Sequence, residues 1–343
     1  MRHLLNTLFV TSEDAWLSLE GENVVVNRDK TPVARFPLHN LQMILCFSYA
    51  GASPALMGAC AQRGVGLAFC TPRGKFLARC TGVTQGNVLL RRTQYRLADD
   101  PAASCQIARS MIFGKVSNAR WSLDRTRRDH GGRIDEDAFR SVSDSLKALL
   151  PQILEAEDGD TLRGLEGAAA SEYFGLFDQM ILRQKEDFFF HGRNRRPPLD
   201  NVNALLSFAY SLLANDCASA LESVGLDAYV GFLHRDRPGR ASLALDLMEE
   251  LRPCMADRFV VTVINNRVLS AADFLREESG AVRLTEEGRQ KFLRQWQQKK
   301  QEVITHPYLE EKLPWGLVPY VQALLLARYL RGDLDGYPPF LWK

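Results

Sequence analysis

The chain has 343 residues, of which 46% are hydrophobic and 24% are charged, and its formal net charge is +2. This length exceeds what one hydrophobic core usually supports, so we expect two domains of ordinary globular composition. The small net charge by itself predicts no polyanionic partner, which leaves the distribution of charge as the more informative quantity.

The first apolar segment, Leu4 to Val10, is too short to cross a bilayer. Acidic residues follow it where a signal peptide would need small neutral ones, so it is predicted to be a strand. No other run is predicted to reach membrane-spanning length, and the expected location is therefore cytoplasmic. The seven cysteines include no C-x-x-C pair, and we interpret them as reduced, mostly buried thiols.

Residues 1–90 alternate short apolar segments with turn residues, a pattern typical of a strand-and-turn meander. One short helix is predicted after Ser53, which can cap it, with Pro54 in the first turn and Gly64 at the end. Residues 65–80 are then predicted to form a hairpin. This part of the chain is therefore expected to be mostly β.

Near Asn87 the apolar period becomes helical, so a domain boundary is predicted near residue 90. It separates an N-terminal β-rich domain, residues 1–90, from a larger α-helical domain, residues 91–343. Glycines and prolines divide the second domain into segments. The predicted segments are helices at 102–116, at 138–150 before Pro151 and from Asp160-Thr161 to about Arg183, a break at Gly131-Gly132, and an ordered extended tail from Asp333 to Lys343.

Glu166 lies on the helix predicted after Asp160-Thr161, and small residues surround it from Gly164 to Ser171. Small residues let other backbones come close, so this carboxylate is expected to be desolvated and to need a cation or hydrogen-bond donors. Taken alone, the stretch favours a tightly packed helix on which Glu166 pairs with an arginine.

His234 ends a short apolar segment just before a polar turn. One side of such a ring can be held rigidly while the other side meets a ligand. Taken alone, a histidine in this position is more often structural.

A short helix is predicted between Ser242, a candidate cap, and Pro253, a candidate stop. Asp246 and Glu249 lie three residues apart on it, so their carboxylates project from one face and repel unless they share a cation. A solvated acidic face is the alternative, and Glu250 is expected to belong to such a face.

Together these residues offer one imidazole and two or three carboxylates. This mixed nitrogen and oxygen set suits Mg²⁺ or Mn²⁺ and lacks the thiolates of structural zinc sites. A metal held in this way can polarise a phosphodiester, stabilise a leaving oxygen and activate a hydroxyl. Phosphoryl transfer is therefore the predicted chemistry.

Four motifs occur in a recognisable order and spacing. They are Gly164-Leu165-Glu166-Gly167 with Tyr173-Phe174, Arg195-Arg196-Pro197-Pro198 with Asn203 to Ser207, Gly231-Phe232-Leu233-His234, and Asp246-Leu247-Met248-Glu249. In these motifs the chain resembles the CRISPR-associated adaptation integrase and endonuclease family, the spacer-acquisition nucleases, especially the form of subtype I-C systems. The N-terminal strands and the closing Pro338 to Trp342 also fit, so the resemblance covers essentially the whole chain.

The resemblance implies an α+β fold, with a small N-terminal β-sandwich-like domain that makes a homodimer and a larger all-α catalytic domain. By position, it implies Glu166, His234 and Glu249 as ligands of Mg²⁺ or Mn²⁺, and Asp246 as an additional active-site acid. It also implies a small second adaptation protein of ferredoxin-like fold as a partner. The implied reaction inserts short DNA fragments into the repeat array, and the implied substrates are double-stranded and branched DNA.

Arginines near the site motifs are expected to contact DNA phosphates without reading sequence, although each is equally compatible with ordinary solvated charge. The expected DNA-contacting residues are Arg193, Arg195, Arg196, Arg235, Arg237 and Arg240. A second basic stretch, Arg289 to Lys300, has five cations and no acid. We interpret it as an exposed amphipathic helix with a core tryptophan rather than as a DNA groove.

Two other functional hypotheses stay open at this point. The chain could be a DNA-binding structural subunit of an adaptation complex with a vestigial acidic site, which would not cleave branched DNA in Mn²⁺. It could also be a metal phosphoesterase of small molecules, whose affinity for DNA would show little dependence on salt.

Overall fold

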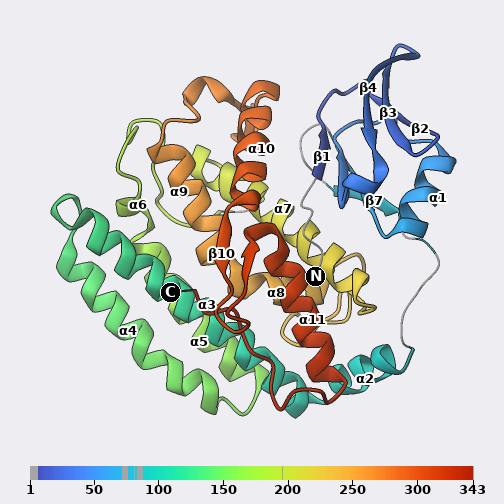
Figure 1. Ribbon diagram of the computed structural model, residues 1–343. Coiled ribbons are helices and arrows are strands. Elements are labelled where there is room, and N and C mark those ends of the chain that lie inside the picture. The colour runs from blue at the N-terminus through green and yellow to red at the C-terminus, as the bar shows by residue number, and fades with distance from the viewer. Residues whose placement is uncertain (1–6, 72–75, 81, 83–87, 195, 343) are drawn as a thin grey trace.

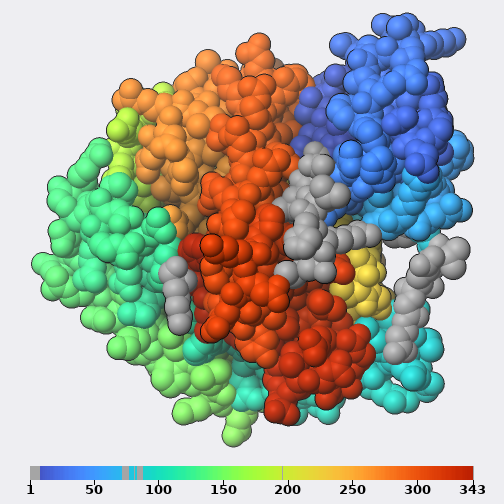
Figure 2. Space-filling view, viewed as in Figure 1, coloured from blue at the N-terminus to red at the C-terminus, as the bar shows by residue number. Residues whose placement is uncertain are grey.

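The computed structural model describes residues 7–71, 76–80, 82, 88–194 and 196–342. Strands occupy the N-terminal part of the chain and helices most of the rest, so the predicted α+β fold class is confirmed (Figure 1). The N-terminal strands and the first helix form a lobe that projects from the helical body, as the space-filling view shows (Figure 2).

Two sheets make up this N-terminal lobe. The first is antiparallel and contains β2 (Trp16–Glu20), β3 (Asn23–Arg28) and β4 (Thr31–Pro37). The second has the order β1-β5-β6-β7 and contains β1 (Thr7–Val10), β5 (Met43–Cys46), β6 (Gly66–Cys70) and β7 (Phe76–Cys80). Strands β6 and β7 pair antiparallel, which confirms the predicted hairpin, although its turn at 72–75 lies outside the described residues.

Side chains of β5 alternate between two hydrophobic cores. Ile44 and Cys46 belong to the core of the lobe, together with residues of the other sheet such as Leu17. Met43 and Leu45 belong to the core of the helical domain. This alternation follows from the two-residue period of a strand. The four-stranded sheet therefore forms part of the contact between the lobe and the helical domain.

Helix α1 (Pro54–Arg63) of the lobe has the predicted boundaries. The Ser53 hydroxyl accepts a hydrogen bond from the Leu56 N–H at 3.2 Å, and Gly64 ends the helix with a φ of +65°. A residue with a side chain would be strained at this left-handed φ, so glycine is the favoured residue at this position.

The helical domain is built around α3 (Pro101–His130), which packs against α4 (Glu136–Glu155), α5 (Gly159–Gly175) and α8 (Ser242–Leu251). The other helices are α2 (Val88–Asp99), α6 (Phe177–Met180), α7 (Asn201–Ser223), α9 (Arg258–Asn265), α10 (Glu286–Gln301) and α11 (Val318–Leu330). Two short hairpins that were not predicted also lie in this domain. They pair β8 (Phe274–Arg276) with β9 (Val282–Leu284), and β10 (Val303–Thr305) with β11 (Lys312–Pro314).

Among the described residues, one helix, α7, is long and apolar enough to cross a membrane. The prediction that no run reaches that length is therefore wrong. The apolar side chains of α7, including Leu205, Leu206 and Leu213, belong to the core of the helical domain, and α7 packs against α8 and α11. A helix at the centre of a protein core needs the same apolar composition as a membrane-spanning helix.

Two prolines do not end helices as predicted. Helix α4 continues through Pro151, because Leu146 and Ile153 on either side of it are buried and their packing outweighs one lost hydrogen bond. After α8 the chain passes through Pro253 in a π-helical turn, Arg252–Asp257, and continues directly into α9. Proline has no backbone N–H to donate, and the wider π turn tolerates this missing hydrogen bond.

Helix α5 differs from its prediction at both ends. Its cap is Asp158, whose carboxylate accepts hydrogen bonds from the N–H groups of Asp160 and Thr161 at 2.8 and 2.9 Å. It ends at Gly175, well before Arg183. Asp158 and Asp160 are both good capping residues, so sequence alone does not distinguish them.

The C-terminal segment, residues 333–342, contains neither helix nor strand, as predicted for an ordered tail. The Phe340 N–H donates to Glu250 Oε2 at 2.9 Å, and the Trp342 N–H donates to Asn118 Oδ1 at 2.8 Å. The tail is thereby attached to α3 and α8, the two helices that carry much of the candidate site.

Candidate active site

Two acids from different helices meet at Lys115 of α3, and a histidine lies beside one of them. The Lys115 ammonium forms an ion pair with Glu166 of α5, and its Nζ lies 2.7 Å from Glu249 Oε2 of α8. His234, in the loop between α7 and α8, places its Nε2 atom 4.0 Å from Glu249 Oε1. The fold thus brings together the three residues that the sequence singled out, although Glu166 is far from the others along the chain.

Asp246 of α8 holds the His234 imidazole in place. Its Oδ1 atom accepts from the His234 backbone N–H at 3.0 Å and lies 2.6 Å from His234 Nδ1. Its Oδ2 atom accepts from the N–H groups of Phe232 and Leu233 at 2.6 and 2.9 Å. Because a carboxylate only accepts, Nδ1 carries the proton and Nε2 remains available as a ligand. Asp246 is thus a positioning residue, both of whose oxygens bind the histidine loop.

Gly231 permits the close approach of this loop to α8. A Cβ atom at position 231 would lie 2.6 Å from Asp246 Oδ2 and 2.9 Å from Ser242 Cβ. Ser242 does not cap α8, contrary to the prediction, because α8 begins without a side-chain cap. Its hydroxyl instead accepts from Arg240 Nε and lies 3.3 Å from the Arg235 carbonyl, so it holds the loop together.

Glu249 is ionised although it is buried, its side chain being 4% exposed. Burial by itself would raise the pKa of this carboxyl, but the nearby cations Arg252 and Lys115 outweigh burial and lower the pKa to about 2. The Arg252 guanidinium lies 3.1 Å from Glu249 Oε1. The ionised state of Glu249 therefore depends on the cations around it.

The donor set fits a divalent cation, but Lys115 takes up the position between the acids. Glu166 and Glu249 offer carboxylate oxygens and His234 offers Nε2, which suits Mg²⁺ or Mn²⁺. Within the part of the chain that the structure describes, no group of three or more His, Cys, Asp or Glu side chains is close enough to hold a metal as it stands. The Lys115 ammonium contacts both carboxylates, so a metal held by these three residues would require Lys115 to move.

A small cavity of about 40 Å³ beside Glu166 is lined by cations, by acids and by aromatic rings that include Tyr210. The guanidinium carbons of Arg193 and Arg252 lie 5.2 and 4.8 Å from the ring centre of Tyr210. The Tyr210 hydroxyl donates to Asp257, and burial raises the pKa of Asp257 to about 6. Lys115 lines the same cavity, so three cations and the carboxyl groups of Glu166 and Asp257 lie around it.

Glu250 does not belong to a solvated acidic face, contrary to the prediction. Its side chain is fully buried, and it accepts hydrogen bonds from Gln322 Nε2 at 2.9 Å, from the Tyr337 hydroxyl and from the Phe340 N–H. Burial raises the pKa of Glu250 to about 7. The residue is structural and joins α8 to α11 and to the tail.

The glycines around Glu166 do not create close packing, contrary to the prediction. A Cβ atom at Gly164 or Gly167 would meet nothing within 4 Å, and the Glu166 side chain is 28% exposed. The partner of Glu166 is Lys115 and not an arginine. Gly164, Gly167 and Ala168 are themselves exposed, so they do not bury the carboxylate.

The predicted DNA-contacting arginines differ in exposure. Arg193 is partly buried and donates to Asn203 Oδ1 at 2.6 Å and to Ser207 Oγ at 3.2 Å. Arg196, Arg235 and Arg237 are exposed, Arg240 is partly exposed, and Arg195 lies outside the described residues. Arg235 follows His234 directly and Arg237 lies three residues after it, so both belong to the loop that carries this histidine.

The second basic stretch, 289–300, lies on α10 and is partly internal. Trp296 is a core residue, as predicted. Arg289 and Lys300 are also buried, and Lys300 Nζ lies 2.9 Å from Asp216 Oδ1. These two cations are paired with acids and buried, so they are not available to a partner at the surface.

Sequence reasoning missed Lys115 and Arg252. Lys115 lies in an otherwise apolar stretch between Ile112 and Val116, both of which are buried. Arg252 follows Glu249 by three residues, a spacing that places opposite charges side by side on a helix. Two signals in the sequence pointed to these residues. Lys115 is a cation within an apolar run, and Arg252 is a cation three residues from a site acid.

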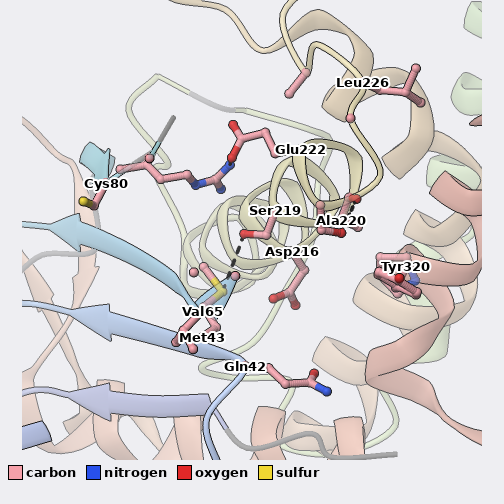
Figure 3. A pocket seen from close by; sticks show the side chains of 18 of the residues that line it. Gln42, Met43, Val65, Cys80, Asp216, Ser219, Ala220, Glu222, Leu226 and Tyr320 are labelled. Carbon is pink, nitrogen blue, oxygen red and sulfur yellow. Dashed lines mark hydrogen bonds and ion pairs between the residues drawn. The ribbon is translucent and has the colours of Figure 1, made fainter. Parts of the chain in front are cut away.

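A larger cavity of about 620 Å³ lies between the N-terminal lobe and the helical domain (Figure 3). Gln42 and Met43 line it from the lobe, and Asp216 and Ser219 of α7 line it from the helical domain. None of the predicted metal ligands lines it. Size alone does not make a catalytic site, so we assign the chemistry to the acids and the histidine.

Comparisons with known proteins match most or all of the chain. A family model described as CRISPR associated protein Cas1 matches residues 8–298, a span that includes Glu166, His234, Asp246 and Glu249. CRISPR-associated endonuclease Cas1 2 of Rhodospirillum rubrum is 52% identical over 347 residues, with 100% of each chain covered. CRISPR-associated endonuclease Cas1 1 of Chlorobaculum tepidum is 47% identical over 343 residues, again with 100% of each chain covered.

Solved structures share the fold at lower identity. A casposase bound to an integration product has a TM-score of 0.84 and 22% identity, with 99% of this chain and 95% of that chain covered. A CAS1 protein from Thermotoga maritima has a TM-score of 0.80 and 22% identity, with 97% and 99% covered. These likenesses concern the arrangement of the elements over nearly the full chain.

Proposed function

The chain belongs to the Cas1 family of CRISPR-associated proteins, and from this premise we propose that it is a divalent-metal-dependent DNA endonuclease and integrase of CRISPR adaptation. The observation that carries the metal dependence is the convergence of Glu166, His234 and Glu249 at a position held by the ammonium of Lys115. These three residues would hold Mg²⁺ or Mn²⁺. Assignment to subtype I-C rests on the sequence resemblance.

The proposed reaction is a transesterification. A 3′ hydroxyl of the incoming DNA forms a bond to a repeat phosphorus, and the bond from that phosphorus to its leaving oxygen breaks. The bound metal would stabilise the charge that develops on the phosphate and on the leaving oxygen. Asp246 directs His234 Nε2 toward Glu249, and Arg252 keeps Glu249 ionised. The Glu166 side chain is 28% exposed, so a DNA substrate could reach it.

We propose double-stranded and branched DNA as the substrate, and the cytoplasm as the location. The casposase of similar fold was solved with an integration product, and a further solved Cas1, with a TM-score of 0.59, was solved with DNA. On this chain, exposed Arg235 and Arg237 next to His234 offer contacts to phosphates. Both features support a DNA substrate.

Two protein partners are part of the proposal. The first is a second copy of the chain, paired through the N-terminal lobe, and the second is a small adaptation protein of ferredoxin-like fold. Both rest on the sequence resemblance. A solved Cas6-RT-Cas1–Cas2 complex supports the second partner, because one of its chains contains this fold with a TM-score of 0.81.

The test is integration of a labelled DNA fragment into a repeat-bearing plasmid, with the second adaptation protein, in Mn²⁺, in Mg²⁺ and in a chelator. Glu166→Gln keeps the shape of the side chain but removes a charged ligand. His234→Ala removes the nitrogen ligand. Each should reduce strand transfer by about a thousandfold or more, which corresponds to roughly 4 kcal/mol of transition-state stabilisation.

The matched control is Glu172→Gln on the same helix, where an amide oxygen can still accept from Ser145 Oγ. It should integrate at the wild-type rate, and all three variants should bind DNA within about twofold of wild type, since phosphate contacts lie elsewhere. Wild-type rates in Glu166→Gln would show that the site is assigned wrongly. DNA binding by the wild type without any metal-dependent cleavage would favour a structural subunit instead.

A further inference from the structure

Lys115 is the cation on which the two site acids converge. Its ammonium pairs with Glu166 and lies 2.7 Å from Glu249 Oε2. The Lys115 side chain is only 12% exposed, so water does not screen these contacts as it would at the surface. Its position on α3 between buried Ile112 and Val116 keeps it pointed at the acids.

The charges of this cluster require a cation between the helices. Glu166 comes from α5 and Glu249 from α8, and the two carboxylates would repel each other at this separation without a positive charge between them. Arg252 contacts Glu249 at 3.1 Å. Lys115 forms ion pairs with both acids, so it links α5 to α8 at this point.

An ammonium and a divalent metal cannot occupy the same place between two carboxylates. We propose that Lys115 is a built-in counter-ion that keeps Glu166 and Glu249 assembled in the metal-free protein and competes with the metal for them. This inference rests on the proposed metal site. Metal binding then requires the ammonium to leave both carboxylates.

The structure provides a place for the displaced ammonium. Lys115 lines the small cavity that also contains Tyr210 and Asp257, and the Asp257 carboxyl can serve as an alternative partner. The four-carbon stem of lysine is flexible, so the ammonium can move while the backbone of α3 stays in place. Lys115 would thus remain close to the site as a mobile positive charge.

The experiment measures Mn²⁺ affinity by electron paramagnetic resonance of free Mn²⁺, and thermal unfolding in chelator and in Mn²⁺. Lys115→Met removes the charge and keeps a stem of similar length. It should bind Mn²⁺ about tenfold more tightly than wild type, a change of the size seen for residues around metal ligands. In chelator it should unfold at a lower temperature, and Mn²⁺ should raise that temperature by more than it does in wild type.

Two variants complete the design. Lys147→Met, at an exposed position on α4, should match wild type in both measurements. Lys115→Gln can still donate hydrogen bonds to both acids without a charge, so it serves if Lys115→Met does not fold in chelator. It should also bind Mn²⁺ more tightly than wild type.

The outcomes separate this inference from the proposed function. Equal or weaker Mn²⁺ binding by both Lys115 variants would overturn the competition, while the metal site would stand. An absence of Mn²⁺ binding in wild type and in the Lys115 variants alike would overturn the metal site and the counter-ion with it. Glu166→Gln should lose Mn²⁺ binding, which ties the measured ion to these acids.

Discussion

Asp246 determines which nitrogen of His234 is available to a ligand. Its two oxygens receive three backbone N–H groups and the Nδ1 proton, and the residue is completely buried. Such a carboxylate fixes the tautomer and the orientation of a metal-binding imidazole. The direction of His234 Nε2 toward Glu249 therefore depends on a residue that need not touch the metal.

We expect Asp246→Asn to disrupt this arrangement although the side chain keeps its size. One oxygen becomes an NH₂ group, and every neighbour on the loop is a donor, so one or more contacts become unfavourable. Mn²⁺ affinity should fall by about 10- to 100-fold. Asp236→Asn, an exposed acid on the same loop, is the control and should behave like wild type. Unchanged Mn²⁺ affinity in Asp246→Asn would show that the imidazole needs no such support.

Gly231→Ala tests the close contact between the histidine loop and α8. The added Cβ would lie 2.6 Å from Asp246 Oδ2, so either the loop or α8 must shift. The expected loss is about 1–3 kcal/mol in the free energy of unfolding, measured by denaturant titration. Gly167→Ala on α5 is the control, because its Cβ meets nothing within 4 Å and alanine favours a helix. Equal stability of Gly231→Ala and wild type would contradict the contact.

At the residue scale, the sequence predicts the acids and the histidine better than their surroundings. Glu166, His234 and Glu249 stand in short motifs that a resemblance can match position by position. Lys115 and Arg252 have no motif of their own, and their roles depend on how α3 and α8 pack. The buried state of Glu250 likewise depends on the tail, which is 90 residues away from it at Phe340.

At the scale of elements, α8, the π turn and α9 act as one continuous helical unit. Glu249 lies near the end of α8, and Arg252 and Asp257 are the first and last residues of the π turn. The wider turn changes the angular positions of these residues relative to an ordinary helix. The π turn thus places Asp257 against Tyr210 in the cavity beside the site.

The pH dependence of stability tests the buried state of Asp257. Burial raises its folded pKa to about 6, above its usual 3.8, although Tyr210 and Arg252 oppose the shift. A raised pKa stabilises the fold at low pH, and this contribution is lost as the pH rises through 6. The unfolding free energy of wild type relative to Asp257→Asn should therefore fall by about 2 kcal/mol between pH 4.5 and pH 6.5.

Denaturant titrations of both proteins at several pH values measure this difference. Taking the difference removes the contributions of other groups, including Glu249, whose lowered pKa acts in the opposite direction below about pH 4.5. A constant gap between wild type and Asp257→Asn across the range would mean that the pKa of Asp257 is not raised by burial.

Helix ends could be predicted from the sequence where the signal was local. Ser53 and Gly64 bound α1 as expected, because capping depends on a few adjacent residues. Pro151 and Pro253 misled the prediction, because tertiary packing and a π turn compensate for the missing N–H. Short hairpins such as β8 with β9 lack a strong pattern and were not predicted.

At the scale of the whole molecule, polar contacts join the N-terminal lobe and α2 to the helical domain. Arg79 of β7 lies 2.8 Å from Glu222 Oε2 of α7. Gln94 of α2 donates to the carbonyls of Asp227 and Val230, just before the histidine loop. The change of apolar period near residue 87 could reveal two parts of the chain, but contacts between them depend on residues far apart in sequence.

The distribution of charge leads to a prediction about DNA binding. The net charge is only +2, so affinity for DNA must come from local groups and not from the molecule as a whole. Arg237 is exposed three residues after His234, in a position to contact a phosphate beside the site. Each such contact releases counter-ions from DNA, which makes the logarithm of affinity fall linearly with the logarithm of salt concentration.

Arg237→Ala should weaken DNA binding to a similar degree for all sequences and reduce the salt slope by about one. Arg35→Ala is the matched control, because Arg35 lies on β4 of the lobe with a 56% exposed side chain, paired with Glu20. Fluorescence anisotropy with labelled branched DNA at several salt concentrations gives both slopes. An unchanged slope in Arg237→Ala would place the DNA path away from the histidine loop, and an equal change in both variants would extend that path to the lobe. A wild-type affinity with almost no salt dependence would instead favour a small-molecule phosphoesterase, since phosphate contacts along DNA cannot form without releasing counter-ions.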